Sequence, residues 1–295
     1  SGGVGVCLTT SGPGATNLIT GITDAYMDSI PIVCLTGQVS TAMVGNDAFQ
    51  EADIVGMTRT VTKHNYLIKD MKDLAPSMQE AFHIARTGRP GPVLIDLPKD
   101  IILGEADFVV PVGEPDIRGY KPKTTGHIRQ IKRVAEAIKV AKKPVLYVGG
   151  GVIHAEADQE VKNLAEKADI PVTWTLLGAS AFPSDHPLAL GMLGMHGTAY
   201  ANLAIDECDL LIAVGARFDD RVTGKISEFA KNAEIIHIDI DPTAIGKNVN
   251  VAIPVVGDAK KVLVEVNKLI KGQKRTIWQK RVELLKKDFP LTFKT

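Results

Sequence analysis

Short apolar segments that alternate with glycine turns and amphipathic stretches constrain the fold of this chain more than any other feature. Apolar runs of strand length that alternate with helical spacing favour a parallel sheet with helices on both of its faces. In the first block, the predicted strands are Val4–Thr9, Pro31–Thr36, Tyr66–Ile68 and Pro92–Leu97. Helices are predicted from the turn Ser11–Asn17 to about Met27, and from Asp73 to Arg86.

A second block of the same kind follows after residue 125. Its predicted helices are His127–Lys142, Glu156–Ala168 and Asp258–Lys271. Its predicted strands are Pro144–Val148, Pro171–Leu176, Asp209–Val214, Glu234–Ile240 and Ile253–Val256. The expected fold class is therefore α/β, with two domains that each place a parallel sheet between two helical layers.

The stretch between the two blocks, from Gly104 to about Thr125, is rich in proline, glycine and charge and has no periodicity, which indicates a linker. A length of 295 residues also corresponds to about two domains. We expect a first domain at 1–105, a linker at 106–125, a second domain at 126–272 and a connector at 273–295.

Composition excludes several classes of protein. Lys and Arg number 34, as do Asp and Glu, so no excess of cations is available for a nucleic acid. No apolar run approaches the length that a bilayer span needs, and no secretory signal is present, so a cytoplasmic protein is expected. Cys7, Cys34 and Cys208 form no CxxC pair, and we expect reduced thiols rather than a disulfide framework or a zinc site.

Glycines and acidic residues follow the predicted strands of the second block. Ligands of open parallel sheets bind beyond the carboxyl ends of the strands, where glycine lets the backbone approach a phosphate closely. The five strand ends carry Gly149–Gly151, Thr175-Leu176, Gly215–Asp219, Asp239–Asp241 and Gly257-Asp258. Their combination favours a dinucleotide site, although the glycine triplet alone is not GxGxxG and is more typical of a tight turn.

Two further segments of the second block each allow two interpretations. Gly194–Thr198 precedes a helix for which Thr198 is a plausible N-cap, so its glycines and His196 either press on a flat ligand or form a capped turn. Arg217–Arg221 concentrates two guanidinium groups and two carboxylates, which form either a clamp for an acid substrate or a surface ion-pair cluster. The residues alone favour the turn and the ion pairs.

In the first block, Ser11–Asn17 forms a strand-to-helix turn that could bind an anion but lacks the lysine of a P-loop. Gly45–Glu51 mixes polar side chains with Phe49 in a predicted loop, which either lines a site or is simply capped by Asp47.

Read together, these segments resemble the catalytic (large) subunit of acetolactate synthase, also called acetohydroxyacid synthase, a thiamine-diphosphate enzyme. The resemblance covers essentially the whole chain. It rests on Thr10–Leu18, Gly45–Glu51, Lys63–Leu67, Gly88–Asp100, Leu146–Gly151, Leu193–Thr198, Arg217–Lys225, His237–Asp241, Ile245–Asn248 and Phe289–Leu291. The first and fourth of these occur across thiamine-diphosphate enzymes, whereas Gly45–Glu51, Lys63–Leu67, Leu193–Thr198 and Arg217–Lys225 are more specific to this synthase.

The resemblance implies a partial pyrimidine-binding domain followed by a complete central FAD-binding, Rossmann-like domain. The chain starts at Ser1 without an initiator Met, so an internal fragment of a longer subunit is expected. The catalytic glutamate would then lie upstream of Ser1 and the segment for Mg²⁺ and diphosphate beyond Thr295, and the fragment alone would be inactive. The implied reaction decarboxylates pyruvate and condenses it with a second 2-keto acid such as 2-oxobutanoate, which begins the synthesis of valine, leucine and isoleucine.

The resemblance also assigns cofactors, partners and site residues. The cofactors are thiamine diphosphate, Mg²⁺ and FAD, and the partners are a second copy in a homodimer or tetramer and a small regulatory subunit. Gln50 and Phe49 would line the active site, Lys99 would stand at its mouth and Arg221 would meet the second acid's carboxylate. The FAD contacts would be Arg89, Gly150, Thr175, Leu176, Leu193, Gly194, Met195, His196, Gly215, Ala216, Arg217, Phe218, Asp219, Asp239, Ile240, Asp258 and Ala259.

The sequence departs from the family pattern at Ser40, where proline is usual, followed by Thr41-Ala42 in place of more basic residues. Weaker binding of sulfonylurea inhibitors is expected as a result. The alternatives are another flavin-containing thiamine-diphosphate enzyme, such as pyruvate oxidase or glyoxylate carboligase, and a non-catalytic dinucleotide-binding module. A nicotinamide dehydrogenase is disfavoured because no GxGxxG fingerprint is present.

Overall fold

The structure, a computed structural model, describes residues 2–107 and 111–292. The chain divides into two compact units, Ser1–Pro122 (unit 1) and Lys123–Thr295 (unit 2), and the boundary falls inside the expected linker. Residues 108–110 of that linker and 293–295 of the expected connector lie outside the described residues.

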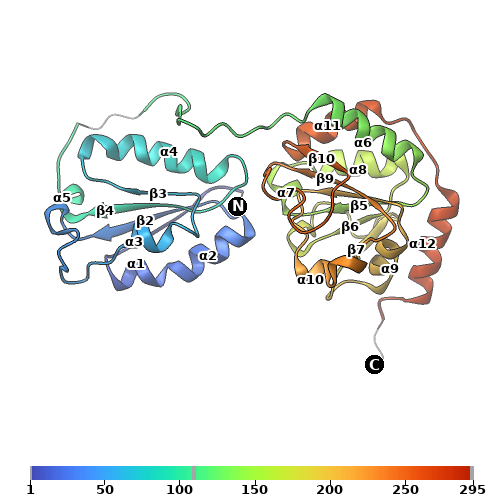
Figure 1. The fold of residues 1–295 in the computed structure, drawn as a ribbon, viewed down its shortest axis with the longest axis horizontal. Helices are drawn as coiled ribbons and strands as arrows, with labels where there is room; N and C mark the ends of the chain where they lie inside the picture. The colour runs from blue at the N-terminus through green and yellow to red at the C-terminus, as the bar shows by residue number, and fades with distance from the viewer. Residues whose placement is uncertain (1, 108–110, 293–295) are drawn as a thin grey trace. The chain divides into compact units, whose positions relative to one another are not determined.

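Unit 1 contains a four-stranded parallel sheet in the order β1-β2-β4-β3. Its strands are β1 (Gly5–Thr9), β2 (Ile32–Gln38), β3 (His64–Leu67) and β4 (Val93–Pro98). Its helices are α1 (Pro13–Asn17), α2 (Ile19–Asp28), η1 (Thr41–Met43), α3 (Ile54–Thr58), η2 (Met71–Asp73), α4 (Leu74–Arg86) and α5 (Lys99–Ile102). Helix α4 covers one face of the sheet and α1, α2 and α3 cover the other (Figure 1).

Neighbouring residues of each strand point to opposite faces, and this alternation produces two cores in unit 1. Val33, Val93 and Ile95 pack against Ala81 and other residues of α4 on one face. Cys34 and Leu94 pack with Ala15, Ile22 and Ile54 on the other face. The central strands β2 and β4 are largely buried on both faces, which explains why these two strands read as nearly continuous apolar runs in the sequence.

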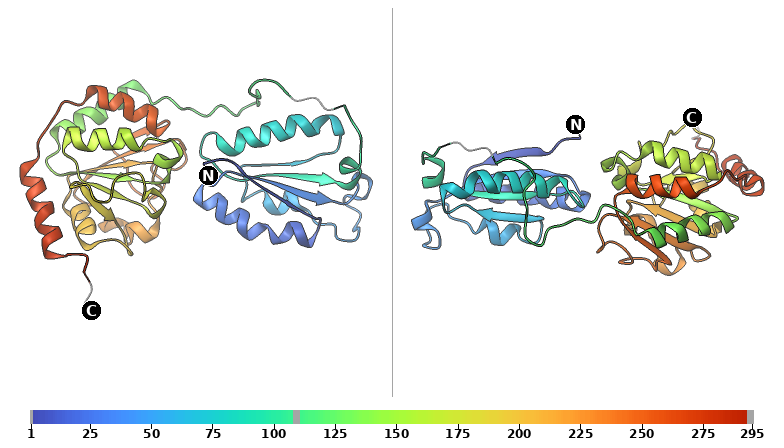
Figure 2. Two further views of the ribbon diagram at one scale, coloured as in Figure 1. Left: turned by 180° about the vertical axis from the view of Figure 1, so that it is seen from behind. Right: turned by 90° about the horizontal axis from the view of Figure 1, so that it is seen from above.

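Unit 2 contains a six-stranded parallel sheet in the order β10-β9-β8-β5-β6-β7. Its strands are β5 (Pro144–Val148), β6 (Val172–Trp174), β7 (Ala189–Met192), β8 (Leu210–Val214), β9 (Glu234–Asp239) and β10 (Ile253–Val256). Its helices are α6 (Ile128–Val140), α7 (Gly150–His154), α8 (Asp158–Ala168), η3 (Leu176–Gly178), α9 (Ala199–Glu207), α10 (Asp220–Thr223), η4 (Ile226–Glu228), α11 (Ala259–Leu269) and α12 (Thr276–Asp288). The views from behind and from above also show a layer of helices on each face (Figure 2).

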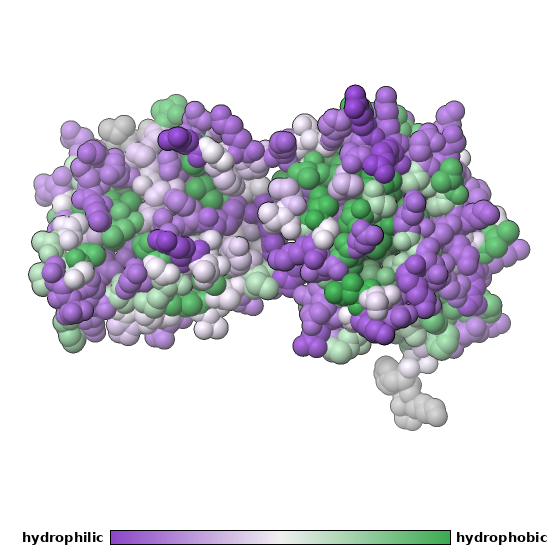
Figure 3. Space-filling view, viewed as in Figure 1, coloured by the Kyte–Doolittle hydropathy of each residue, from purple (hydrophilic) through white to green (hydrophobic). Residues whose placement is uncertain are grey.

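The helices of unit 2 divide between the two faces of its sheet. Leu146, Ile212 and Ile236 pack under α6, α8 and α11, whereas Val145 and Leu211 pack under α9 and α12. The strongly amphipathic α6 buries Ile131, Val134, Ala135 and Ile138 against the sheet, and much of the surface of unit 2 in Figure 3 is hydrophilic. The prediction of an α/β fold with two parallel sheets is confirmed.

Several elements differ from the sequence prediction. The expected connector contains α12, whose Trp278 is 1% exposed and donates from Nε1 to the Pro144 carbonyl at 3.0 Å. Gly150 and Gly151 begin α7 rather than forming only a turn, and β7 was not predicted. The first helix is interrupted at Leu18, which separates α1 from α2. These differences come from tertiary packing, which local sequence patterns do not encode.

Within the two described stretches, no helix combines the length and the apolar character that crossing a bilayer would require.

Candidate functional site

The carboxyl ends of the six strands of unit 2 meet at one edge of its sheet because all the strands are parallel. The chain runs from β5 outward to β6 and β7, returns through α9 to β8, and continues outward to β9 and β10. The order therefore reverses between β5 and β8. In open α/β sheets, such a switch point opens the crevice in which ligands bind.

Glycines line this switch point, where the loop after β5 touches the loop after β8. The Gly151 amide donates to the Gly215 carbonyl at 3.1 Å, and the Gly149 amide donates to the Val214 carbonyl at 3.0 Å. A Cβ atom on Gly149 would lie 2.2 Å from the Gly215 oxygen, and one on Gly151 would lie 2.7 Å from Gly215 Cα. Any side chain here would separate the two loops, so glycine is required by the close backbone approach.

The loop Gly215–Asp219 is anchored by its own residue Phe218, which has a φ of 55° and whose ring is buried, with 2% of the residue exposed. Its ring packs edge-on against Tyr147 and His237, with centroid distances of 5.7 and 5.0 Å. Asn248 Nδ2 donates to the Phe218 carbonyl at 2.9 Å and to the Arg217 carbonyl at 3.1 Å. The loop is therefore anchored at its centre while its two ends stay at the sheet edge.

Arg217 and Asp219 form an ion pair at this edge, with 3.0 Å between Nη2 and Oδ2. The pKa of Asp219 is lowered, first because its carboxylate accepts the Arg221 amide and further by the Arg217 charge. The same carboxylate caps α10. The predicted local ion pair is thus present, and the strand end carries a stable negative charge beside a guanidinium group.

The loops after β6 and β7 expose apolar side chains at the same edge. Leu176 is 75% exposed and Met195 is 61% exposed, and hydrophobic surface is visible between charged residues on this unit in Figure 3. Thr175 Oγ1 accepts the Gly178 amide at 3.0 Å, which fixes the turn that carries Leu176. Large exposed side chains of this kind could cover a flat apolar ring system.

The turn after β7 is fixed by a helix side chain that the sequence did not single out. The Asn202 amide group accepts from the Gly194 amide at 2.8 Å and donates to the Gly194 carbonyl at 3.0 Å. Thr198 caps α9 by accepting the Ala201 amide at 3.1 Å, as predicted, and His196 is exposed. Asn202 lies in an ordinary helical stretch, so no sequence signal distinguishes it.

The outer strands contribute acidic groups. Asp239 ends β9 and accepts the Asp241 amide at 2.8 Å, and Ile240 beside it is half-buried. Asp258 follows β10 and caps α11 by accepting the Lys261 amide at 3.0 Å. Four of the predicted contacts, Leu193, Ala216, Phe218 and Ala259, have buried side chains and offer only their backbone to this edge.

Two buried polar side chains lie beneath this edge. Tyr147, Ala213 and His237 are register partners on β5, β8 and β9 and form a row across one face of the sheet. Tyr147 and His237 are fully buried, and the Tyr147 hydroxyl and both His237 ring nitrogens make no hydrogen bond. Burial raises the pKa of Tyr147. Neither residue was predicted to have a role at the site, because each lies within an apolar strand pattern.

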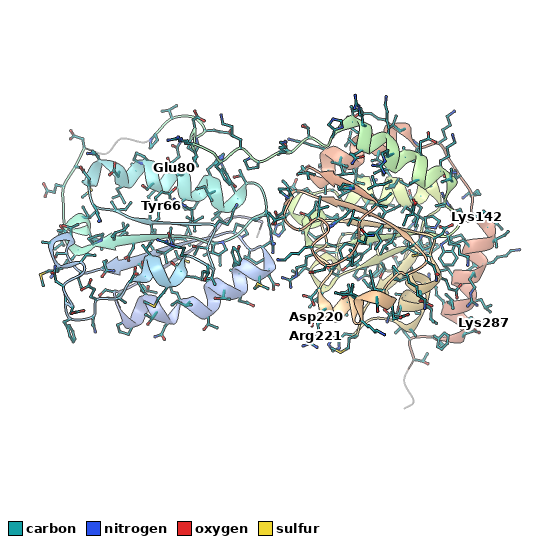
Figure 4. All side chains as sticks on the ribbon, in the orientation of Figure 1. Tyr66, Glu80, Lys142, Asp220, Arg221 and Lys287 are labelled. Atoms are coloured by element: carbon teal, nitrogen blue, oxygen red, sulfur yellow. The ribbon has the colours of Figure 1, made fainter. Side chains whose placement is uncertain are left out.

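Arg221 lies on α10, next to the Gly194 turn. Its carbonyl accepts the Met195 amide at 2.8 Å, and a Cβ on Gly194 would lie 2.6 Å from that same oxygen. The Arg221 side chain is 69% exposed, and its Nε is 4.0 Å from the largely exposed Asp220 carboxylate (Figure 4). A guanidinium held by so weak a contact remains able to bind a carboxylate.

The sheet of unit 1 has its own carboxyl edge, where the turn after β1 meets the loop after β2. A Cβ on Gly12, which has a φ of 55°, would lie 2.6 Å from the Gln50 carbonyl. Gln50 itself has a φ of 60°, and its neighbour Phe49 is 89% exposed. Glu51 closes the loop by accepting the Gly45 and Ala48 amides, and these bonds lower its pKa.

A buried carboxylate supports the base of this loop. Asp96 is 1% exposed and accepts from Thr36 Oγ1 at 2.7 Å and from Gln38 Nε2 at 2.9 Å. Gln38 also donates to the Ala52 carbonyl at 2.8 Å and accepts the Val39 amide, so it joins both ends of the loop to β4. Burial raises the pKa of Asp96, against the lowering effect of its two hydrogen bonds.

Of the remaining predicted residues of unit 1, Lys99 lies at this carboxyl edge and Arg89 does not. Lys99 begins α5 directly after β4, and its neighbour Asp100 accepts from the Thr41 amide and hydroxyl, beside Ser40. Arg89 precedes β4 and donates from Nε to Ser29 Oγ at 2.8 Å, at the edge where the strands begin. The structure therefore brings Gln50, Phe49 and Lys99 to one edge of the sheet and leaves Arg89 at the other.

Comparisons with known proteins find similarity along the whole chain. Residues 1–57 match the family model described as the N-terminal TPP binding domain of thiamine pyrophosphate enzymes, and residues 131–266 match the model of their central domain. The chain is 54% identical to a probable acetolactate synthase large subunit of Methanocaldococcus jannaschii over 97% of this chain and 49% of that protein. It is 52% identical to an acetolactate synthase large subunit of Corynebacterium glutamicum over 98% of this chain and 47% of that protein. The chain spans about half the length of the curated relatives that it matches.

Proposed function

Because this chain belongs to the thiamine pyrophosphate enzymes, we propose that it serves in an acetolactate synthase and that unit 2 binds FAD there. The proposed reaction decarboxylates pyruvate and joins the product to a second 2-keto acid, to give 2-acetolactate or 2-aceto-2-hydroxybutyrate. Thiamine diphosphate, when bound, supplies the electron sink that allows CO₂ to leave a 2-keto acid. The chain's own residues bind, orient and enclose the reactants.

The residues of unit 2 fit a flavin dinucleotide, and this fit is the observation that carries the proposal. The glycines at the switch point let the loops after β5 and β8 pack backbone against backbone, because a Cβ at Gly149 or Gly151 would occupy the space that the opposite loop fills. A dinucleotide would bind beyond these strand ends, where ligands of open parallel sheets are found. Asp239 and Asp258 are acceptors suited to ribose hydroxyls, and the exposed Leu176 and Met195 suit the isoalloxazine rings.

In unit 1, Gln50 and Phe49 would line the reaction cavity and Lys99 would stand at its mouth. The Gly12–Gln50 backbone contact and the Glu51 hydrogen bonds hold the loop in one conformation, which supports an orienting role for Gln50. The exposed ring of Phe49 is available to exclude water from a bound substrate.

Arg221 would bind the carboxylate of the second keto acid. Its weak contact with Asp220 leaves the guanidinium able to form a bidentate pair, which is stronger once solvent is excluded.

We further propose a homo-oligomer, a small regulatory subunit and a cytoplasmic location, and the relatives' designation as large subunits supports the regulatory partner. Among the described residues no group of three or more potential metal ligands converges, so no step is assigned to Mg²⁺.

Flavin binding by this chain tests the proposal directly. The purified chain is titrated with FAD, and binding is followed by the visible absorption and the fluorescence of the flavin. Leu176→Asp should weaken binding about tenfold or more, equivalent to about 1.4 kcal/mol, because it places a charge against the rings. Leu291→Asp is the matched control, since both leucines belong to unit 2 and both are 75% exposed. Failure of the chain to bind FAD, or an equal effect of both substitutions, would refute the assignment.

A different flavin-containing thiamine-diphosphate enzyme is the second candidate, because the proposed site at the carboxyl edge of the sheet of unit 2 suits any flavin dinucleotide. Product analysis separates the two, since only a synthase forms acetolactate from pyruvate. In an enzyme containing this chain, Arg221→Gln should lower kcat/KM for the second keto acid by roughly 10- to 100-fold, the loss of a charged hydrogen bond. Decarboxylation of pyruvate should change much less.

A further inference from the structure

Two thiols that are far apart in the sequence meet in unit 1. Cys7 on β1 and Cys34 on β2 are register partners in neighbouring parallel strands, and their Sγ atoms are 3.2 Å apart. Cys34 is 1% exposed, whereas Cys7 is half-buried on the outer strand of the sheet. Neither side chain is among the residues that the proposed synthase reaction uses.

We propose that Cys7 and Cys34 form a dithiol site at which a hydroperoxide produces a disulfide between β1 and β2. The pairing is geometrically accessible, because neighbouring strands lie about 4.8 Å apart and disulfides span Cα separations of about 4.4–6.8 Å. The two sulfur atoms must approach by about 1.1 Å to reach a bond of about 2.05 Å. Val6 and Leu8, which flank Cys7 on β1, have side chains that are 57% and 71% exposed, so fewer packed side chains oppose this shift than in the buried strands of the same sheet.

The unequal exposure of the two thiols assigns their order of reaction. The Cys7 thiolate attacks one oxygen of the hydroperoxide, the O–O bond breaks, and Cys7 becomes a sulfenic acid while the other oxygen leaves and is protonated. The Cys34 sulfur then attacks Cys7 Sγ, and the sulfenic hydroxyl leaves as water with the Cys34 proton. Overall, two thiols lose two electrons and two protons, and the hydroperoxide is reduced to water and an alcohol or a second water.

The buried position of Cys34 supports a resolving role rather than a first attack. Burial, together with the neighbouring Cys7, raises the pKa of the Cys34 thiol, so little thiolate is available for direct reaction with a peroxide. Cys208 provides an internal comparison. It is fully buried, donates to the Ile205 carbonyl at 3.1 Å, and burial raises its pKa to about 12.

The experiment treats the folded chain with hydrogen peroxide, counts free thiols and maps disulfides by peptide mass spectrometry. Counted after the peroxide is removed and the chain is unfolded, the free thiols should fall from the three of the sequence to the single Cys208, and dithiothreitol should restore all three. The cross-linked peptide should join Cys7 to Cys34. In urea the same treatment should no longer favour this pair over pairs with Cys208, because the strand register is lost.

Two substitutions at buried thiols give a matched comparison. Cys34→Ser should abolish the intramolecular disulfide and leave Cys7 as a trapped sulfenic acid, whereas Cys208→Ser should leave disulfide formation unchanged. The peptide map of the unsubstituted chain decides the question even if a variant fails to fold. Three surviving thiols, or oxidation of Cys7 to a sulfinic acid while Cys34 stays free, would overturn the proposal.

Discussion

The close approach of the loops after β5 and β8 can be tested with two adjacent glycines of α7. Gly150 and Gly151 are both helical, and neither has a positive φ. A Cβ at position 151 would lie 2.7 Å from Gly215 Cα, a backbone atom that cannot rotate away. A Cβ at position 150 would lie 3.2 Å from Leu177 Cβ, so the segment that carries the exposed Leu177 has to yield by only a few tenths of an ångström.

The two substitutions share one energy contribution and differ in another. Replacing a helical glycine by alanine stabilises a helix by about 0.5–1 kcal/mol, and this gain applies at both positions. Inserting a methyl group against packed backbone costs about 1–3 kcal/mol, and this cost applies at position 151. Gly151→Ala should therefore leave unit 2 about 1–3 kcal/mol less stable than Gly150→Ala does.

Urea unfolding followed by tryptophan fluorescence measures this difference. Both tryptophans, Trp174 and Trp278, are buried in unit 2, so their emission reports the unfolding of that unit. With an m-value of about 2 kcal/mol/M, a difference of 2 kcal/mol moves the urea midpoint by about 1 M. If Gly151→Ala were as stable as Gly150→Ala, the two loops would not touch as described, and the geometry of the crevice proposed to bind FAD would be wrong.

Three further predictions concern other parts of the chain. Because the pKa of Asp96 is raised in the folded state, the stability of unit 1 should fall as the pH rises from about 3.8 through the folded pKa. In Asp96→Asn, the urea midpoint measured by circular dichroism should depend less steeply on pH. Equal slopes of midpoint against pH in the two proteins would contradict this prediction. Trp278→Ala should destabilise unit 2 by about 3–5 kcal/mol, whereas the exposed neighbour Ile277→Ala should change its melting little, within about 0.5 kcal/mol. Glu51→Gln should increase hydrogen exchange across residues 45–51, and the native loop should loosen similarly as the pH falls through the lowered pKa of Glu51. Unchanged exchange would show that its carboxylate does not order the loop.

Much of the architecture follows from local sequence patterns. Apolar runs such as Pro92–Leu97 and Pro144–Val148 predict strands buried on both faces, which in turn require parallel pairing and crossover helices. Parallel pairing then brings Gly149, Gly215 and Asp239 to one edge, because every strand of such a sheet ends on the same side. The N-cap at Thr198 was likewise predictable, since it depends on residues within one turn.

Contacts between distant residues were decided only by the tertiary structure. The Cys7–Cys34 pair and the row of Tyr147 and His237 depend on strand register, which no local pattern specifies. The burial of Trp278 depends on where α12 packs, so its segment read as a connector in the sequence. The local pattern of apolar and polar residues determines which segments form helices and strands. Only packing determines which residues distant in the sequence come into contact, because that outcome depends on the free energy of the whole core.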